Sequence, residues 1–297
     1  MDYPAPRAPA ESTAGFDRYG PDIPTSPVVI SVPHSGREYP PAMLVGARVG
    51  MDVLRRLEDR YADLLAHRLI ARDLPVIIAR APRALIDLNR DEREVDPAMV
   101  TGAPRSAAFA TSAKLRGGLG LVPRRLADIP SLWGAPLSWA ELRDRIDSIH
   151  RPYHAAVARL MAAAREAHGH AILVDLHSMP PLVAGGAGQP AVRLVLGDRF
   201  GRGASARLMT LAADVAAGHG IATAQNHPYA GDHMIERHGR PAHGLHALQL
   251  EVDRSLYLDA ALDRPGRGLA RTRALIFDIV KALAVELPRM SMPIAAE

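Results

Sequence analysis

AILVDLHSMP, residues 171–180, is the stretch that decides the fold, because a continuous apolar run ends abruptly in Asp175, His177 and Ser178. Apolar runs of this length that stop at a turn signal are typical of strands buried on both faces. PVVISVPHSG, residues 27–36, repeats the pattern with a second histidine followed by serine. Ligands of open α/β sheets bind beyond the carboxyl ends of such strands, so we expect both histidines beside a site.

Two histidines in matching positions indicate a zinc site at His34 and His177. Neutral imidazoles bind Zn²⁺ at about 2.0–2.1 Å, and strand ends fix the positions of the rings. The alternative is that each is an ordinary core or loop histidine. The chain has no cysteine, so any further ligand must be His, Asp, Glu or water.

The composition indicates an ordinary globular enzyme-sized chain. Its 297 residues are 48% hydrophobic and 23% charged. The net charge of +4 comes almost wholly from arginine, because Lys114 and Lys281 are the only lysines. Basic runs interleaved with aromatic residues are missing, which argues against a nucleic-acid partner. No apolar run is long enough to span a membrane, and the N-terminus does not resemble a signal peptide, so we expect a cytoplasmic protein.

The order of apolar patterns predicts an α/β fold with one domain and a mixed, largely parallel sheet flanked by helices. Residues 1–26 carry no apolar period and are expected to form a flexible arm before a domain at 27–297. A long irregular segment at 97–137 is expected to border the site. Strands are predicted at about 28–32, 74–80, 84–90, 171–177, 191–197, 222 and 245–252, and helices at about 51–72, 138–168, 204–217 and 271–287.

Further polar residues follow predicted strands. Asn89 and Arg90 could hold a substrate carboxylate, since a guanidinium makes two parallel hydrogen bonds to one. The alternative is a salt-bridged turn with the neighbouring acidic residues. Glu251 at the end of a buried strand is a candidate general base, because burial raises the pKa of a carboxylate. The alternative is an ion pair with Arg254.

Together these residues resemble the N-formylglutamate amidohydrolase family. The resemblance extends over about residues 28–260, and it implies a distant similarity to the zinc carboxypeptidase or phosphorylase/hydrolase-like fold. That fold has histidine, acidic ligand, arginine, Asn-Arg, histidine and glutamate in this order. The matching motifs are VPHSG at 32–36, Glu58-Asp59 with Asp63, Arg83 with IDLNR at 86–90, DLHS at 175–178, Asn226 with PYAG at 228–231, and GLHALQLE at 244–251 with Arg254, Leu256, Tyr257 and Asp259.

The resemblance implies zinc-dependent hydrolysis of N-formyl-L-glutamate to formate and L-glutamate, with zinc on His34, Asp59 and His177. The distant carboxypeptidase pattern has an acidic ligand three positions after the first histidine, where this chain has Arg37. The third ligand is therefore expected to be Asp59, with Glu58, Glu38 or a water molecule as alternatives.

The resemblance also implies roles for the remaining residues. Glu251 takes a proton from the attacking water and passes it to the leaving amine, and Arg83, or alternatively Arg37, stabilises the oxyanion. The expected substrate-binding residues are Asn89, Arg90, Arg37, Ser178, Asn226, Tyr229 and Arg254.

The expected partner is a small N-acyl amino acid, with no nucleic acid and no membrane, and the sequence contains no indication of oligomeric state. Two other functions stay open. One is a related zinc amidase or carboxypeptidase for another N-acyl amino acid or peptide, and the other is a carboxylate-binding protein without catalysis.

Overall fold

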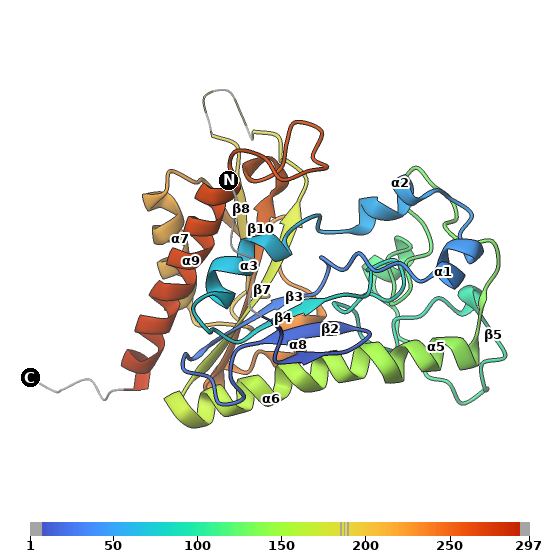
Figure 1. Ribbon diagram of the computed structural model, residues 1–297, viewed down its shortest axis with the longest axis horizontal. Helices are drawn as coiled ribbons and strands as arrows, with labels where there is room; N and C mark the ends of the chain where they lie inside the picture. The colour runs from blue at the N-terminus through green and yellow to red at the C-terminus, as the bar shows by residue number, and fades with distance from the viewer. Residues whose placement is uncertain (1–7, 185, 187, 189, 292–297) are drawn as a thin grey trace, which may run out of the picture.

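An eight-stranded sheet forms the centre of the computed structural model, which describes residues 8–184, 186, 188 and 190–291 (Figure 1). Strands β4, β3, β7 and β10 are neighbours and mutually parallel, whereas β2 and β8 run antiparallel to the adjacent strands β4 and β10. The predicted mixed, largely parallel sheet is confirmed. The order is β1 (Glu11–Ser12), β2 (Phe16–Tyr19), β4 (Val76–Ala79), β3 (Val28–Val32), β7 (Ala171–Met179), β10 (Leu245–Asp253), β8 (Leu194–Gly197) and β9 (Thr223–Gln225).

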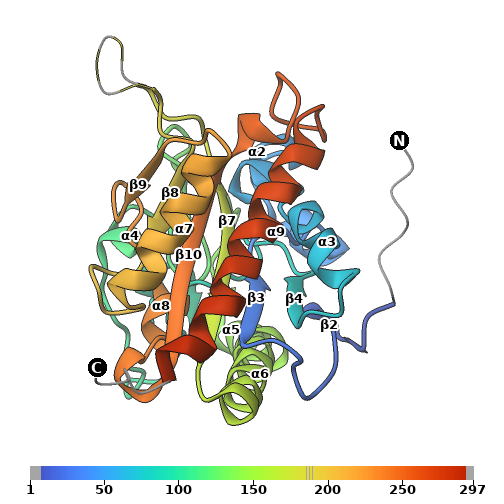
Figure 2. The same ribbon diagram turned by 90° about the vertical axis from the view of Figure 1, so that its left-hand side faces the viewer.

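Helices cover both faces of the sheet. On one face lies α6 (Arg151–His168), and on the other lie α3 (Asp63–Ile70), α7 (Ala206–Gly218) and α9 (Leu269–Glu286) (Figures 1 and 2). Successive strand side chains point to opposite faces, so β3, β4, β7 and β10 each contribute to two apolar clusters. Shorter helices are α1 (Pro41–Gly46), α2 (Met51–Leu54), α4 (Ala113–Arg116), α5 (Trp139–Arg145) and α8 (His233–His238).

The remaining elements are short. A two-stranded sheet pairs β5 (Val100–Thr101) with β6 (Leu137–Ser138). The segments of 3-10 helix are η1 (Arg55–Leu57), η2 (Pro97–Met99), η4 (Pro241–His243), η5 (Arg254–Leu256) and η6 (Leu287–Ser291).

The parallel strands β3, β7 and β10 end at one edge of the sheet. Their register pairs Glu251 with His177 and Ser31 with Asp175. Because side chains two apart on a strand share a face, these four side chains lie on the face that α6 covers. The sheet thus gathers the polar ends of three strands in one place, as the sequence predicts.

The predicted helix over 51–72 is wrong in its middle. Helix α2 ends at Leu54, η1 follows, and α3 begins only at Asp63. Between them the chain is extended at Glu58 and Tyr61 has a positive φ of 56°. The backbone N–H of Asp59 donates to the carbonyl of His34 (2.9 Å) instead of to its own helix. Because of this break, the side chain of Asp59 faces the interior of the protein.

The predicted strand at 84–90 is also wrong. These residues form successive turns, in which the Asp87 carboxylate accepts from the backbone N–H of Asn89 (2.9 Å). Such local side-chain bonds compete with a strand ladder. In addition, both edges of β4 are already paired, with β2 and β3, so the sheet has no place beside β4 for another strand.

The flexible arm expected at 1–26 includes a strand of the sheet. Residues 16–19 form β2, which pairs with β4, and the side chain of Phe16 is buried. The folded domain therefore begins before residue 27, and residues 1–7 lie outside the described part of the chain.

The predicted helix over 138–168 is continuous in the structure but contains one wide turn. Helix α5 leads into a π-helical segment, Ile146–His150, and then into α6. The side chain of Ser138 caps its start by accepting from the backbone N–H of Glu141 (3.1 Å).

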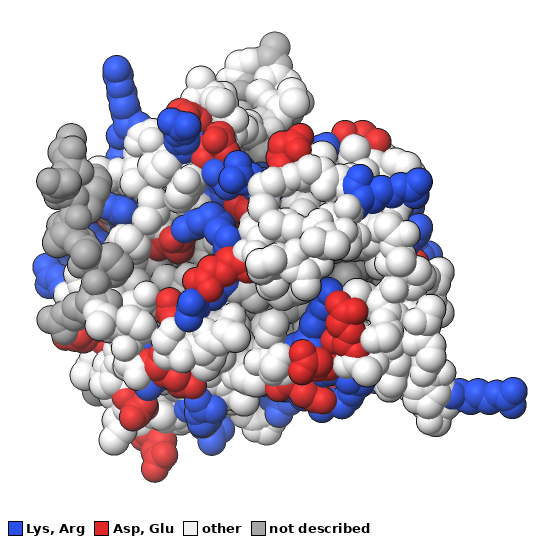
Figure 3. Space-filling view, turned by 45° about the vertical axis from the view of Figure 1, so that its right-hand side comes forward, with Lys and Arg blue, Asp and Glu red and all other residues white. Residues whose placement is uncertain are grey.

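In the part of the chain that the structure describes, no helix combines the length and the apolarity that crossing a bilayer requires. On the face shown in Figure 3, Lys and Arg side chains alternate with Asp and Glu instead of forming one continuous basic patch.

Replacing Phe16 with alanine should lower the free energy of unfolding by about 3–5 kcal/mol, because it empties a buried aromatic position. Phe16 is 1% exposed, and its ring meets that of Tyr153 edge-on with centroids 5.6 Å apart. Urea unfolding measures the change. Ile23→Ala, at a side chain 73% exposed, is the matched control from the same segment and should change stability by less than about 0.5 kcal/mol. Equal effects of the two variants would contradict the docking of β2.

Candidate active site

A cavity of about 220 Å³ opens at the carboxyl ends of β3, β7 and β10. The turns at 83–89, the long irregular segment 97–137 and the residues before α8 complete its wall. This confirms that residues 97–137 border the site. The lining residues are His34, Arg56, Leu57, Asp59, Arg83, Asn89, Lys114, Leu119, Leu126, His177, Ser178, Met179, Pro180, Tyr229, Asp232, Glu251 and Arg254.

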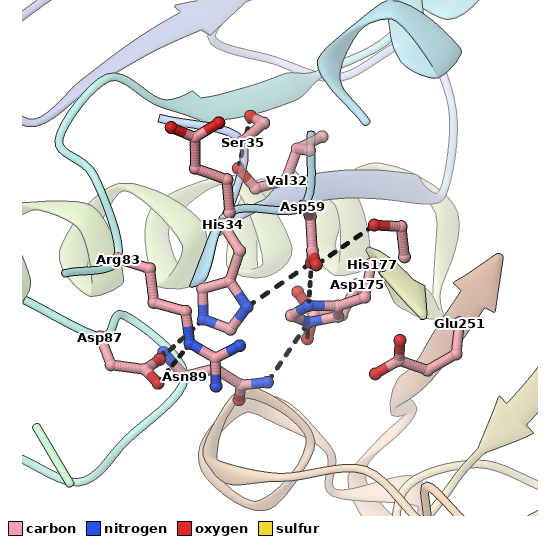
Figure 4. A network of polar contacts seen from close by, with 12 residues as sticks. Val32, His34, Ser35, Asp59, Arg83, Asp87, Asn89, Asp175, His177 and Glu251 are labelled. Atoms are coloured by element: carbon pink, nitrogen blue, oxygen red, sulfur yellow. Dashed lines mark hydrogen bonds and ion pairs between the residues drawn. The ribbon is translucent and has the colours of Figure 1, made fainter. Parts of the chain in front are cut away.

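His34, Asp59 and His177 converge at the base of this cavity (Figure 4). One potential ligand atom from each lies within 4.8 Å of the other two, and all three side chains are buried. Asp59 Oδ2 is 3.0 Å from His177 Nδ1 and 3.6 Å from His34 Nδ1. His34 follows β3, Asp59 lies in the break between η1 and α3, and His177 is on β7. The three residues are far apart in the sequence, and the fold brings them together.

The opposite nitrogens of both histidines are held by carboxylates. His34 Nε2 lies 2.7 Å from Asp87 Oδ1, and His177 Nε2 lies 2.7 Å from Asp175 Oδ2. Each Nε2 therefore donates to its carboxylate, and each Nδ1 faces Asp59 and is the atom that a neutral imidazole leaves free to bind a cation. Carboxylate-bound histidines of this kind are the usual ligands of protein metal sites.

The residues present fit a metal ion. His34 Nδ1 is buried and has no hydrogen-bond partner among the residues that the structure describes. A buried lone pair without a partner costs free energy, and a cation between His34, Asp59 and His177 would satisfy it. Two imidazole nitrogens and one carboxylate oxygen are also a donor set that divalent transition metals accept.

Asp59 is oriented by Arg254 and Ser178. Ser178 Oγ and Arg254 Nη2 both donate to Asp59 Oδ1 at 3.2 Å, and Arg254 Nε donates to Ser178 Oγ at 3.0 Å. Oδ2 is left for the histidines. Burial alone would raise the pKa of Asp59, but the neighbouring His177 and His34 side chains hold it well below its usual range, so Asp59 is ionised.

The two other acidic candidates face elsewhere. Glu58 accepts from Arg60 Nη1 (2.7 Å) and from the hydroxyl of Tyr39 (2.6 Å). The more exposed Glu38 pairs with Arg80 (2.8 Å). Of the three acidic residues that the sequence left open, the structure brings Asp59 to the histidines.

Glu251 lies beside His177 in the sheet register and lines the same cavity. Gln249 Nε2 donates to Glu251 Oε1 (2.8 Å) and fixes the carboxylate, which Figure 4 shows beside the histidine group. Burial raises the pKa of Glu251 to about 7. A carboxylate with a pKa near neutrality can both accept and return a proton.

Five other sequence-predicted residues line the cavity: Arg83, Asn89, Ser178, Tyr229 and Arg254. Arg83 donates through Nε to Asp87 Oδ2 (2.8 Å), which places its guanidinium next to the histidine group. Asn89 Oδ1 accepts from the backbone N–H of Met234 (2.8 Å), and its Nδ2 lies 3.2 Å from His177 Nε2. Asn89 therefore contacts the candidate metal group through its amide nitrogen.

Three predicted substrate-binding residues do not line the cavity. Arg37 makes a two-bond pair with Asp63 (2.8 and 2.9 Å). Arg90 is 2% exposed and contacts the carbonyl of Asn89 (2.6 Å) and Asp232 (3.1 Å).

Asn226 is similarly held within the protein. It donates to Asp198 Oδ1 (2.7 Å) and accepts from the backbone N–H groups of Asp198 and Phe200. Arg37, Arg90 and Asn226 therefore organise the surrounding protein through internal partners.

Sequence reasoning missed Lys114 and Arg56 in the cavity wall. Lys114 comes from α4 in the irregular segment, and its Nζ lies 4.0 Å from Asp232 Oδ2. The feature of the sequence that could have pointed to Lys114 is the rarity of lysine, because the chain has only one other. The roles of Asp87 and Asp175 as histidine partners were also missed. Asp175 stands two residues before His177, a spacing that puts both side chains on one face of a strand.

Known proteins resemble this chain over most of its length. The family model for N-formylglutamate amidohydrolase matches residues 26–258. N-formylglutamate deformylase of Pseudomonas putida is 28% identical over 241 residues, which cover 78% of this chain and 82% of that protein. The Pseudomonas aeruginosa enzyme of the same name is 28% identical over 269 residues, covering 86% and 92%.

A solved structure is similar as well. The crystal structure of N-formylglutamate amidohydrolase from Ralstonia eutropha JMP134 matches with a TM-score of 0.84 and 31% identity, covering 93% of this chain and 99% of that chain.

Proposed function

The chain belongs to the N-formylglutamate amidohydrolase family, and on this premise we propose that it hydrolyses N-formyl-L-glutamate to formate and L-glutamate with the help of a bound zinc ion. The observation that carries the proposal is the convergence of His34 Nδ1, Asp59 Oδ2 and His177 Nδ1 beside the carboxylate of Glu251. Three protein ligands, an open position and a neighbouring base are the parts of a hydrolytic zinc site.

A zinc ion on these ligands would supply Lewis-acid chemistry, acidifying a water molecule and polarising the formyl carbonyl. Glu251 accepts the proton of the attacking water as the new C–O bond forms at the formyl carbon. Burial raises the pKa of Glu251 to about 7, which suits a group that accepts and returns a proton, and Gln249 holds the carboxylate in place. The same carboxyl group then gives the proton to the amide nitrogen as the C–N bond breaks, releasing formate and the amine of glutamate.

Arg83 is the cation for the developing oxyanion. Its Nε is held by Asp87, so the guanidinium is fixed at the cavity wall before substrate binds. Burial would lower the pKa of Arg83, but the Asp87 and Asp59 carboxylates raise it, so the side chain stays charged. A prepositioned charge stabilises the transition state without reorganisation.

Lys114 is the proposed partner of a substrate carboxylate. N-formyl-L-glutamate carries two carboxylates. The cavity wall offers Lys114 and Arg56 as cations, in addition to Arg254 and Arg83. Arg56 already makes two hydrogen bonds to Asp128 (2.7 and 2.8 Å). The ion pair of Lys114 with Asp232 is longer, at 4.0 Å.

The direct test is formate release by the purified protein, first with zinc and then after chelation. N-formyl-L-glutamate should release formate only with metal, and N-acetyl-L-glutamate and N-formyl-L-methionine should react far more slowly. Faster cleavage of either analogue would move the activity to another N-acyl amino acid. Full activity in the metal-free protein would refute the role of zinc.

Asp59→Asn should weaken metal binding by more than about 100-fold, because it removes a charged ligand. Loss of a group that only hydrogen-bonds a metal-binding histidine already costs roughly 10–100-fold in affinity. The amide keeps an oxygen for Arg254 and Ser178, so the fold should survive. Elemental analysis after dialysis against buffered zinc measures the content. Glu38→Gln and Glu58→Gln are the matched controls and should keep wild-type zinc. Loss of zinc in either control would reassign the third ligand.

Glu251→Gln should lower kcat by about 10²–10⁴-fold while zinc content and KM change little, because the amide cannot accept a proton. Initial rates of formate release measure the loss. Glu236→Gln removes a comparable charge from an exposed position on α8 and should be active. Near-normal turnover of the metal-loaded Glu251→Gln variant would rule out this base.

Lys114→Met should raise KM for N-formyl-L-glutamate about tenfold with little change in kcat, since one charge-assisted hydrogen bond to the substrate is lost. Lys281→Met, at the only other lysine, lies exposed on α9 and is the control. If kcat fell and KM did not change, Lys114 would act in the chemical step instead of in binding.

A further inference from the structure

A second group of histidines lies behind the turns that carry Asp87 and Asn89. His150 ends the π-helical segment, His154 lies one turn later on α6, and His233 and His238 are on α8. All four are buried. The ring centroid of His154 lies 4.5 Å from that of His150 and 5.3 Å from that of each α8 histidine.

Hydrogen bonds fix the protonation of two of these rings. His150 Nε2 lies 2.8 Å from the carbonyl oxygen of Arg90, and His154 Nε2 lies 3.0 Å from that of Leu88. A carbonyl oxygen only accepts, so both Nε2 atoms carry hydrogen and both Nδ1 atoms keep a lone pair.

Two nitrogens of the group are buried and have no hydrogen-bond partner within the described part of the chain. These are His150 Nδ1 and His233 Nε2. His154 Nδ1 accepts only from another imidazole, His238 Nε2, at 3.0 Å. As a purely neutral imidazole network, the cluster would leave two buried ring nitrogens unsatisfied, which is unfavourable.

We propose that His150, His154 and His233 form a second metal site, for a divalent transition ion such as Zn²⁺. One potential ligand nitrogen from each lies within 4.8 Å of the other two. The carbonyls of Arg90 and Leu88 orient His150 and His154 as outer partners orient metal-binding histidines. Imidazole is a ligand that suits zinc, nickel and copper. Metal binding would take the His154 Nδ1 lone pair from its hydrogen bond with His238 Nε2.

Burial keeps these imidazoles neutral, which is the form that binds metal. Burial, together with Arg237, lowers the pKa values of all four, to about 4 for His233 and about 3 for His238. The other cations near the group are Arg90 and Arg240, and the nearby anions are Asp87, Asp91 and Glu92. Arg237 is exposed, so solvent screens its repulsion of a bound ion.

The proposed ion has a structural role. The carbonyls of Leu88 and Arg90 flank Asn89, and the backbone N–H of Met234, next to His233, donates to Asn89 Oδ1 (2.8 Å). Metal on the three histidines would tie α6 and α8 to the turn that supplies Asp87 and Asn89 to the cavity. This site is separate from His34 and His177 and does not depend on the proposed reaction.

The test counts metal equivalents on the purified full-length chain, using Zn²⁺ for elemental analysis and Co²⁺ for visible absorption. The wild type should hold two equivalents. His150→Gln keeps an amide N–H for the Arg90 carbonyl but removes the Nδ1 ligand, and His233→Asn removes the Nε2 ligand. Each variant should hold one equivalent and bind a second at least about 100-fold more weakly. His243→Asn, at an exposed histidine, is the control and should hold two.

His34→Gln isolates the proposed site, because it removes an Nδ1 ligand from the cavity group but keeps a donor for Asp87. Zn²⁺ should raise the melting temperature of this variant, and the rise should vanish when His150→Gln or His233→Asn is added. The two additions act on different elements, so a folding defect in one does not affect the other. A single equivalent in the wild type, lost in His34→Gln, would overturn the proposal, as would two equivalents unchanged by both cluster variants.

Discussion

The burial of three carboxylates, Asp59, Asp87 and Asp175, around two histidines is the constraint on which the rest of the structure depends. Removing an ion from water costs several kcal/mol unless partners replace the solvent. Here Arg83 compensates Asp87, Arg254 compensates Asp59, and the hydroxyl of Ser31 donates to Asp175 (3.0 Å). Each charged group is thereby fixed in one orientation, and the cavity is organised before any ligand binds.

This constraint explains why the backbone is irregular where the sequence looks regular. A continuous helix over 51–72 would keep Asp59 one turn from Asp63 on its surface, whereas the break lets the backbone of Asp59 bond to His34 and its side chain face inward. The turns at 84–90 similarly let Asp87 bond to His34 while its other oxygen holds Arg83. In both places, polar partners remote in sequence override the local apolar pattern.

The same distinction separates what could be predicted from what could not. Strands β3, β7 and β10 were predictable because their apolar runs end at polar residues, and parallel pairing follows from the intervening helices. Most of the polar side chains predicted at the site do line the cavity, but the exceptions Arg37, Arg90 and Asn226 were not predictable, because each is engaged by a partner elsewhere in the chain. Arg90 looked like a carboxylate binder beside Asn89, but Asp232 and backbone carbonyls engage it. Lys114 lies in a segment without period, where local pattern gives no position.

The turn at 87–90 lies between two histidine groups and contacts both. The side chains of Asp87 and Asn89 reach His34 and His177, while the carbonyls of Leu88 and Arg90 accept from His154 and His150. The side chains of this turn therefore contact the histidines of the cavity, and its carbonyls contact the second histidine group behind it. A shift of either carbonyl would move Asp87 and hence the proton-bearing Nε2 of His34. Packing behind the cavity thus sets the orientation of a ring inside it, which is why a precise site needs support beyond its own lining residues.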